Sequence, residues 1–234
     1  MVKKMARFER RERRRDFKEE KPEWIPKTDI GRQVKSGQIT SVEEIFFMGK
    51  KILEHEIVDH LYPNLEEQTL EVSSTQRMTD NGRKMQFRAI VLVGDKNGHV
   101  GVGAGKSEEV KPAIESAIKN AKRNLTSVPL GKTGKFKHTL PVKVVGKAGS
   151  VEVTLKPAPL GIGLVANDVV RKVLSFAGVK DVWSFSRGHT RNIYNTSMAV
   201  IDAIEQLNSM RIQGGWEPVI ESQVKLKSGE KVSS

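Results

Sequence analysis

The sequence predicts an α+β protein made of two units, each of which combines antiparallel strands with helices. The first observation is a two-residue apolar period over 85–93, which resumes at 99–104 after a glycine-rich turn. The second is an apolar stripe at helical spacing between 112 and 125. The third is a stretch at 128–136 rich in Pro, Gly and Lys, after which strand and helix patterns begin again.

The first unit is predicted to open with a helix and to continue into three antiparallel strands. Ser41 and Glu44 form a capping-box pattern, which predicts an amphipathic helix running toward Leu61 unless Gly49 interrupts it. The strands follow at Leu70–Arg77, Lys84–Val93 and His99–Ala104. Alternation in the second strand places one apolar row on a core, formed by Met85, Phe87, Ala89, Val91 and Val93. Gly94–Gly98 supplies the positive-φ residues of a tight hairpin.

A helix then closes the first unit. Pro112 fits its first turn, where a missing backbone N–H costs nothing. Its apolar stripe consists of Ile114, Ala117, Ile118, Ala121 and Leu125. Lys119, Lys122 and Arg123 lie away from that stripe.

The second unit is predicted to begin with a hairpin. Leu140–Val145 and Ser150–Lys156 form its strands around the turn Gly146–Gly149. A helix is expected from about Leu164 to Ala177, with Val165, Val169, Val170, Val173 and Leu174 facing inward. A strand at Val179–Phe185 and a helix at Ile193–Leu207 complete it. The predicted organisation is therefore a basic extension (1–40), a first domain with its preceding helix (41–130), a C-terminal domain (131–213) and a polar tail (214–234).

Charge and composition narrow the class of partner. The chain has 40 Lys and Arg residues against 28 acidic ones, a net charge of +12, which favours nucleic acid or an anionic membrane surface. Residues 1–21 alone carry ten basic and five acidic side chains and resemble a basic arm, although a solvated helix or a disordered tail has the same composition. No apolar run approaches the roughly 18 residues of a membrane span, and no secretory signal is present. These features favour a cytoplasmic protein without a membrane partner, and the absence of Cys excludes disulfides and thiolate chemistry.

Two motifs that suggest catalysis fail on inspection, and a third is absent from the sequence. Gly101–Ser107 ends in Gly-Lys-Ser like a phosphate-binding P-loop, but that motif needs glycine where this chain has Val100. His55 and His60 are five residues apart, so one helix could not aim both at a metal ion. No Gly-x-Ser-x-Gly elbow occurs. We therefore expect no catalytic residue, no metal site and no cofactor.

Two further segments have the composition of binding loops. Glycines in Pro157–Gly163 precede a predicted helix, where their N–H groups could hold an anion, while a tight loop that needs positive φ explains them equally well. Arg187–Asn192 is typical of a polar phosphate-binding loop between a strand and a helix, with Arg187 and Arg191 as contacts.

The motifs together carry a resemblance to one family. The glycine-punctuated stretch Gly82–Gly103, with Gly82-Arg83, Phe87, Ala89, Leu92–Asp95, Gly98 and Val100-Gly101, resembles the signature of small-subunit ribosomal protein five. Pro157–Pro159 with Gly161 and Gly163, Ala177–Val179, and Asn192 with Asn195 before Ile201-Asp202 are similar to its second domain. The resemblance covers about 65–208. Glu23–Pro26, Gly31-Arg32 and Ser41–Ile45 resemble archaeal and eukaryotic members, which favours an archaeal origin.

The resemblance implies a fold and a set of partners. It implies a first domain with the α-β-β-β-α fold of double-stranded-RNA-binding domains, followed by a βαβ domain. It also implies binding to small-subunit rRNA, contact with ribosomal proteins four and eight, and a position near protein three in the channel through which mRNA enters. Because the helix after the strands opens with Ser107-Glu108-Glu109 in place of lysines, duplex gripping through that helix is not expected.

The expected binding residues follow from the basic segments and the resemblance. Gly82, Arg83 and Lys84 should form a cationic loop beside Arg77, where phosphate could reach it. The full set of expected RNA contacts is Arg10, Arg11, Arg13, Arg14, Arg15, Arg77, Arg83, Lys84, Arg88, Lys106, Lys132, Lys135, Lys137, Arg187, Arg191, Asn192 and Asn195. The resemblance assigns Gly161, Gly163 and Arg171 to the interface with protein four.

The sequence thus indicates a structural rRNA-binding protein that contributes to subunit assembly, mRNA entry and decoding accuracy. Two other functions remain open. A free double-stranded-RNA-binding factor could use the same basic sheet, and a small-molecule kinase is suggested by relatives of the second domain and by Gly105-Lys106-Ser107.

Overall fold

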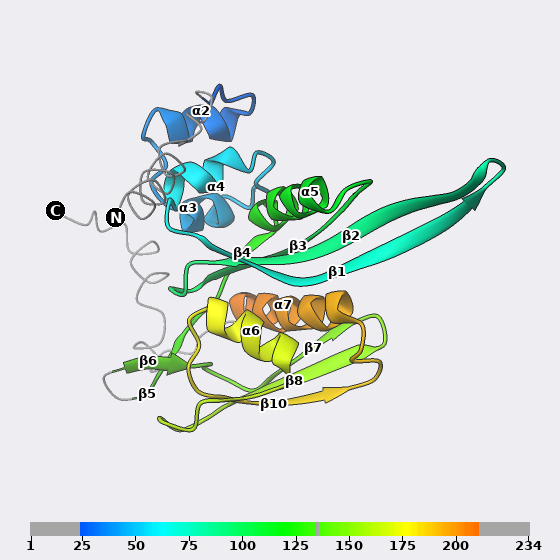
Figure 1. Ribbon diagram of the computed structural model, residues 1–234. Helices are drawn as coiled ribbons and strands as arrows, with labels where there is room; N and C mark the ends of the chain where they lie inside the picture. The colour runs from blue at the N-terminus through cyan, green and yellow to red at the C-terminus, as the bar shows by residue number, and fades with distance from the viewer. Residues whose placement is uncertain (1–23, 134–135, 211–234) are drawn as a thin grey trace, which may run out of the picture.

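Two four-stranded sheets organise the chain in the computed structural model, which describes residues 24–133 and 136–210 (Figure 1). The first has the order β1-β2-β3-β4, formed by β1 (Glu66–Thr79), β2 (Gly82–Gly94), β3 (His99–Ser107) and β4 (Leu125–Ser127). The second has the order β7-β8-β10-β9, formed by β7 (Val144–Ala148), β8 (Val151–Pro157), β9 (Leu164–Val165) and β10 (Val182–Arg187). A short ribbon of β5 (Gly131–Thr133) and β6 (Phe136–Thr139) lies between them in the chain. The α+β prediction is confirmed.

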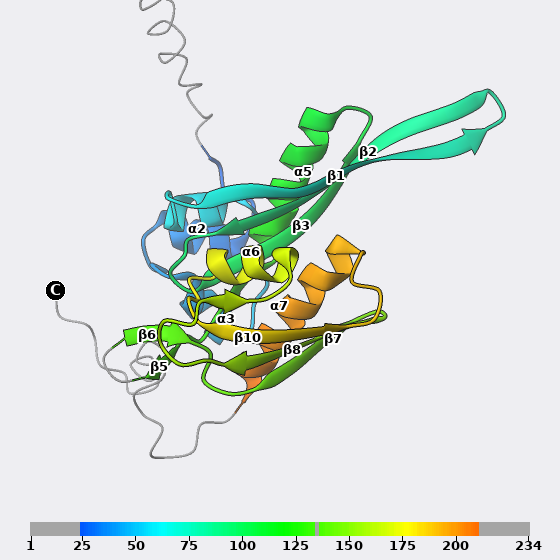
Figure 2. The same ribbon diagram turned by 60° about the horizontal axis from the view of Figure 1, so that its bottom comes forward.

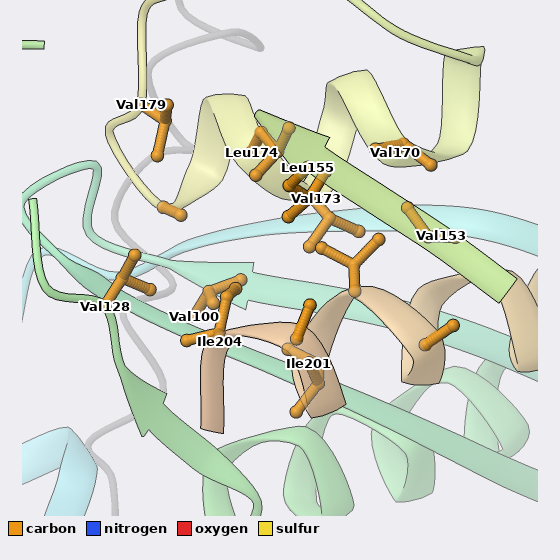
Figure 3. Packing of buried hydrophobic residues seen from close by; sticks show 14 of the residues in the cluster. Val100, Val128, Val153, Leu155, Val170, Val173, Leu174, Val179, Ile201 and Ile204 are labelled. Carbon is orange, nitrogen blue, oxygen red and sulfur yellow. The ribbon is translucent and has the colours of Figure 1, made fainter. Parts of the chain in front are cut away.

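Helices separate and cover the sheets, which gives four layers (Figure 1). Helix α5 (Val110–Arg123) packs on the outer face of the first sheet. Helices α6 (Asp168–Phe176) and α7 (Ile193–Ser209) lie between the two sheets and contribute to one shared apolar core. Figure 3 shows side chains of this core, among them Val100 from β3, Leu155 from β8 and Ile204 from α7.

Strand β2 is buried on both faces along its second half. Ala89, Val91 and Val93 pack against α5, as the predicted apolar row requires, but Met85 at the start of that row is exposed, because the hairpin projects there beyond the fold. Ile90 and Leu92, on the opposite face, belong to the core shared with α6 and α7. The prediction of a single buried row was therefore incomplete, because the second unit covers the face that alternation alone left open.

Helix α5 and strand β3 approach more closely than side chains normally allow. A Cβ atom on Gly103 would collide with the Ala117 carbonyl oxygen and with the Ala121 backbone, and Gly101 and Gly105 face the same helix in the same way. The facing helix positions are the buried residues Ala113, Ala117 and Ala121. Glycines at every second strand position, against alanines at every fourth helix position, let the two backbones touch.

The N-terminal helices form a smaller apolar cluster of their own. The cluster combines Leu125 with buried residues of three helices, α2 (Asp29–Lys35), α3 (Val42–Phe47) and α4 (Glu56–Leu61). The predicted helix from Ser41 to Leu61 is thus two helices, interrupted between Phe47 and Glu56 by a segment that contains Gly49 (φ +68°), as that glycine suggested. Ser41 makes no side-chain cap, and Glu44 accepts bonds from the Thr40 backbone (3.4 Å) and hydroxyl (3.3 Å) instead.

One carboxylate attaches the start of the described chain to this cluster. Glu54 accepts hydrogen bonds from the indole of Trp24 (3.0 Å) and from the backbone N–H groups of Lys27 (2.9 Å) and Thr28 (2.6 Å). Burial alone would raise the pKa of Glu54, but the bonds from Thr28, Trp24 and Lys27 outweigh it and lower that pKa. Trp24 therefore anchors the segment, while Ile25 beside it is exposed.

Several element boundaries in the second unit differ from the sequence prediction, since β7 begins at Val144 and β10 at Val182. The β7–β8 turn lies at Gly149-Ser150, so Gly146 is a strand residue instead of part of the turn. The helix expected from Leu164 begins at Asp168, because Leu164 and Val165 form β9 and pair in parallel with Val182 and Trp183. Val165 is consequently exposed and Val169 only partly buried, in contrast to the prediction that both face inward.

The turn between β2 and β3 is fixed by a partly buried acid. Asp95 accepts bonds from the backbone N–H groups of Asn97 (2.8 Å) and His99 (3.0 Å), and its other oxygen lies 2.7 Å from Nδ1 of His99. Burial would raise the pKa of Asp95, but the bonds from His99 and Asn97 lower it. Lys96 (φ +60°) and Gly98 (φ +109°) have the positive φ values predicted for this turn.

Lys122, which the sequence places away from the apolar stripe, is nevertheless buried. Its Nζ is 2.8 Å from Asp59 on α4 and 2.9 Å from Glu67 on β1. Burial would lower the pKa of Lys122, but its bonds to Asp59 and Glu67 outweigh that effect and raise it. The lysine thereby joins the N-terminal helices to the first sheet.

Gly103→Ala tests the contact between α5 and β3. We expect a loss of at least about 2 kcal/mol in the free energy of unfolding, because the added methyl group meets backbone atoms that cannot rotate away. Ala117→Gly in the same chain should not restore stability, since the clash is with carbonyl oxygen and backbone. Urea unfolding measures both. As a control, Gly37→Ala (φ +76°, open space) should cost about 1 kcal/mol; equal losses at the two sites would contradict the close-packing explanation.

Lys122→Met tests the buried ion pairs. We expect a loss of about 1–3 kcal/mol at pH 7, because Asp59 and Glu67 lose their shared cation while remaining partly exposed to water. The raised pKa means that the wild-type contribution is complete below the unfolded value of about 10.4 and disappears as the pH rises through the folded value. The difference in unfolding free energy between the two proteins should therefore be largest at pH 7 and should shrink as the pH is raised stepwise above about 10.4. A difference that persists unchanged would show that packing alone is lost.

Candidate RNA-binding surface

The long β1–β2 hairpin projects beyond the rest of the fold in both views (Figures 1 and 2). Its register places Arg77 opposite Lys84 and Met78 opposite Arg83, and Thr79 pairs with Gly82 across the turn. All three cations are exposed, and so are the side chains of Met78 and Met85. The predicted proximity of Arg77 to the 82–84 segment is confirmed, and the hairpin tip is a cationic surface on a rigid ribbon.

Lys84 has an acidic neighbour. Its Nζ lies 2.7 Å from the Glu108 carboxylate, which precedes α5. The hydrogen bond to Glu108 and its charge raise the pKa of Lys84 and lower that of Glu108. Both side chains are in water, so a phosphate can compete with Glu108 for this lysine.

The base of the hairpin adjoins the start of α7. The guanidinium of Arg88 lies over the Tyr194 ring, 5.1 Å from its centroid, and Arg88 is partly buried. Lys106 on β3 pairs with Arg88 across the sheet and is exposed. Arg88 thus holds two parts of the fold together, while Lys106 is available to a partner.

A second polar group lies where β10 leads into α7. Arg187 and Arg191 are exposed, and the guanidinium of Arg187 lies 5.1 Å from the Phe185 ring centroid. Asn192 is the N-cap of α7, and its side chain accepts a bond from the Asn195 N–H (3.2 Å). The structure therefore gives Asn192 a capping role that the sequence analysis did not assign.

Some predicted contacts cannot be located. Arg10, Arg11, Arg13, Arg14, Arg15 and Lys135 lie outside the described residues. Lys132 and Lys137 pair with each other in the β5–β6 ribbon, and their side chains are not described. The role of each in RNA binding stays a prediction.

The glycines of the predicted interface loop donate to the protein's own carboxylate. The N–H groups of Gly161 (3.1 Å) and Gly163 (2.7 Å) both bond to Oδ1 of Asp181, which is 4% exposed. Both glycines have positive φ (+93° and +77°), and a Cβ atom on either would meet open space. The tight-loop interpretation is therefore the better supported one, since an internal acid already occupies the N–H groups that an outside anion would need.

Asp181, which holds this loop, also lies next to a buried histidine. The second carboxylate oxygen of Asp181 lies 3.0 Å from Nδ1 of His138, and both side chains are buried. Asp181 and His138 were missed by the sequence analysis, because they lie about 20 residues or more from the loop and share no motif with it. Above them, Leu160 (62% exposed) and Ile162 (41% exposed) point their side chains toward solvent. Arg171 is exposed on α6 and bonds to the Ala166 carbonyl (3.3 Å).

The motifs that resembled catalytic sites have structural explanations. Gly101, Gly103 and Gly105 serve the contact with α5, so the Gly-Lys-Ser sequence is part of a strand. His55 precedes α4, lies 3.0 Å from Glu56, and has a pKa that burial lowers. Over residues 24–133 and 136–210, no group of three or more His, Asp or Glu side chains is arranged to hold a metal ion. No helix in this same part of the chain is long and apolar enough to cross a membrane.

Comparison with known proteins identifies the family. Residues 65–129 match the N-terminal domain of ribosomal protein S5, and residues 146–213 match its C-terminal domain. The chain belongs to the ribosomal protein S5 family. The two matched regions contain the first sheet with α5 and the second sheet with α6 and α7, respectively. The resemblance inferred from the sequence is confirmed.

Curated S5 relatives match along most of their length. The chain is 48% identical to small ribosomal subunit protein uS5 of Methanoregula boonei over 198 residues, which is 82% of this chain and 96% of that protein. It is 51% identical to the uS5 of Methanobrevibacter smithii (81% and 91% covered) and 50% identical to that of Methanocaldococcus jannaschii (81% and 89% covered). These relatives are archaeal, in agreement with the N-terminal motifs, and membership of the S5 family makes the chain a structural ribosomal protein and not an enzyme.

Proposed function

We propose that this S5-family chain is a structural component of the small ribosomal subunit that binds rRNA phosphates through the tip of the β1–β2 hairpin. The observation that carries the proposal is the exposed group Arg77, Arg83 and Lys84 at the end of a ribbon that projects from the fold (Figure 2). Cations at fixed spacing on a rigid strand pair suit the phosphate backbone, which offers charge without base identity. Met78 and Met85 add exposed apolar surface that could rest on ribose or base.

The position of α5 distinguishes this surface from ordinary duplex binding. The helix begins after Glu108 and Glu109, and Glu108 is paired with Lys84. Carboxylates at this end of the helix repel phosphate, so the hairpin and not α5 is the proposed RNA contact. Lys106 and Arg191 extend the basic surface toward α7, and the arm 1–21 would add phosphate contacts of its own.

The finer roles belong to the same proposal. By its family, the chain would contact small-subunit proteins four and eight and lie near protein three, lining the channel through which mRNA enters. The loop Leu160–Gly163 would meet protein four, since two exposed apolar side chains stand on a backbone that Asp181 holds in place. Decoding accuracy would then depend on this loop.

Co-sedimentation separates this function from its main alternative. The full chain should sediment with small subunits from which it has been removed by a salt wash, at one copy per subunit. A free double-stranded-RNA-binding factor would instead stay in the supernatant, and it would bind synthetic RNA duplexes as tightly as it binds rRNA.

Arg83→Ala with Lys84→Ala should weaken rRNA binding without base preference, because the lost contacts are to phosphate. Each lost contact should flatten the slope of log affinity against log salt by about one. Binding titrations at several salt concentrations measure the slope. The pair Lys27→Ala with Arg32→Ala removes the same charge elsewhere and should change the slope less; equal effects would mean that net charge alone is responsible.

Glu108→Ala provides a further check on the same surface. Removing this carboxylate frees Lys84, so rRNA binding should strengthen slightly and never weaken.

Gly161→Arg should alter decoding more than it alters folding. The added side chain meets open space, so the isolated protein should lose only the backbone cost of about 1 kcal/mol or more that a positive φ imposes. In ribosomes the same side chain would push against the neighbour of the loop. Stop-codon readthrough and melting of the isolated protein are measured in parallel; collapsed melting with normal decoding would make the loop purely structural.

A further inference from the structure

The loop between α3 and α4 carries exposed apolar and basic side chains next to one another. Phe47 (67% exposed), Met48 (50%) and Leu53 (64%) are open to solvent. Lys50 and Lys51 lie between them in the chain and are exposed as well. These five residues are called the α3–α4 platform below. Three large apolar side chains so close together at the surface are typical of a binding site.

The backbone of the platform is fixed at both ends. Helix α3 ends in a Schellman motif, in which the N–H of Gly49 (φ +68°) donates to the Phe46 carbonyl (3.0 Å). The N–H of Lys50 donates to the Ile45 carbonyl (3.3 Å) in the same motif. Further along, Ile52 is 3% exposed and belongs to the core of the N-terminal helices. The exposed side chains therefore stand on an ordered backbone, which lowers the entropy cost of binding.

Positive charge predominates on the platform. Neither Lys50 nor Lys51 forms an ion pair with another residue in the part of the chain that the structure describes. The nearby carboxylates of Glu44 and Glu54 already accept hydrogen bonds from other residues of the helical cluster. Glu43 remains on α3 as a single carboxylate against two unpaired lysines. The platform therefore suits an anionic ligand.

The platform is separate from the hairpin surface. The N-terminal helices lie toward the end of the first sheet that is opposite the β1–β2 tip (Figures 1 and 2). The segment also precedes both regions that match the S5 family, which begin at residues 65 and 146. Trp24 is bound to Glu54, the residue after Leu53, with its indole nitrogen 3.0 Å from the carboxylate. The basic segment 1–21 thus joins the described fold beside the platform, so a polyanion bound there lies near additional cations.

Residue types favour RNA over a protein as the ligand. Lysine is depleted at the centres of protein interfaces, yet two of the five platform residues are lysines. An exposed aromatic ring offers a face on which a nucleobase stacks, and flanking lysines reach the phosphates on either side. A base can stack on Phe47 only if it is not already stacked and paired within a duplex. The ligand is therefore an unpaired nucleotide.

We propose that the α3–α4 platform is a second RNA-binding site, which takes an unpaired nucleotide of rRNA. Phe47 stacks on the base, and Lys50 and Lys51 bind the adjacent phosphates. Met48 and Leu53 provide apolar contact around the ring. The hairpin tip reads charge alone, whereas this site distinguishes unpaired from paired RNA. The inference relies on the proposed function only for the identity of the RNA as rRNA.

Titration with oligouridylate, which has no base pairs, tests the stacking. The full chain carries Arg83→Ala and Lys84→Ala in every sample, so that the hairpin tip contributes little. Phe47→Ala should weaken oligouridylate binding by about fivefold or more, without changing the salt dependence or the affinity for an RNA duplex. Phe47→Tyr keeps the ring and should retain binding, whereas Phe47→Leu should not. Phe185→Ala, which removes another exposed ring, should have no effect. Unchanged affinity in Phe47→Ala, or equal losses in Phe185→Ala, would overturn the proposal.

The lysines are tested by the salt dependence of the same titration. Lys50→Ala with Lys51→Ala should flatten the slope of log affinity against log salt by about 0.7 for each lysine, the value for single strands. Lys111→Ala with Lys119→Ala removes the same charge from the exposed side of α5 and should change the slope less. Equal slopes in the two double variants would contradict a phosphate site on the platform.

Ultraviolet crosslinking in assembled subunits tests the identity of the ligand. Subunits that contain the full chain are irradiated and digested with trypsin, and peptides that carry nucleotides are identified by mass spectrometry. The peptide 36–50, which contains Phe47, should carry a nucleotide. If other peptides of the chain carry nucleotides and this one does not, or if it is crosslinked only to a protein, the proposal is wrong. If the chain fails to enter subunits, the proposed function fails instead, and the oligouridylate titration still decides whether the platform binds unpaired RNA.

Discussion

The contact between the backbones of α5 and β3 is the constraint on which the remaining structure depends. Gly101, Gly103 and Gly105 remove the side chains from the middle of one face of the strand, and the alanines of the helix lie directly against them. The opposite face of the same strand carries Val100 and Val102, which enter the core shared with α6 and α7. Strand β3 therefore contacts α5 closely through its glycines, and on its other face it packs against α6 and α7 through its valines. The same glycines resemble part of a nucleotide-binding loop in the sequence. They lie in a strand packed against a helix, so they do not form such a loop.

Periodicity predicted the type and order of most elements, because alternation and helical spacing are properties of short segments. The three strands, α5, the interrupted N-terminal helix and α7 were all expected. The start of α6 was not expected. Leu164 and Val165 are apolar and fit a helical pattern, and only their pairing with β10 makes them a strand. Lys122 was misjudged for a similar reason. Its two carboxylate partners come from α4 and β1, more than 50 residues away in the sequence. The pattern of residues along α5 alone therefore could not predict them.

In the candidate site too, local geometry could be predicted from the sequence, whereas long-range contacts could not. Hairpin geometry was enough to bring Arg77 beside Lys84, because a two-stranded register follows from the turn. What each side chain does afterwards depends on neighbours that the sequence does not place. Glu108 engages Lys84, Tyr194 lies beneath Arg88, and the capping position uses the oxygen of Asn192. The carboxylate of Asp181, which holds the interface loop, belongs to the same class of long-range contact.

The doubly buried half of β2 has a consequence for the order in which the chain is made. Ile90, Leu92, Val100 and Val102 leave the ribosome before α6 and α7, which cover them in the finished fold. Until about residue 207 has been synthesised, the first sheet can complete only its contact with α5 and must present a bare apolar face to its surroundings. The core shared by the two family domains can therefore form only after both have been synthesised.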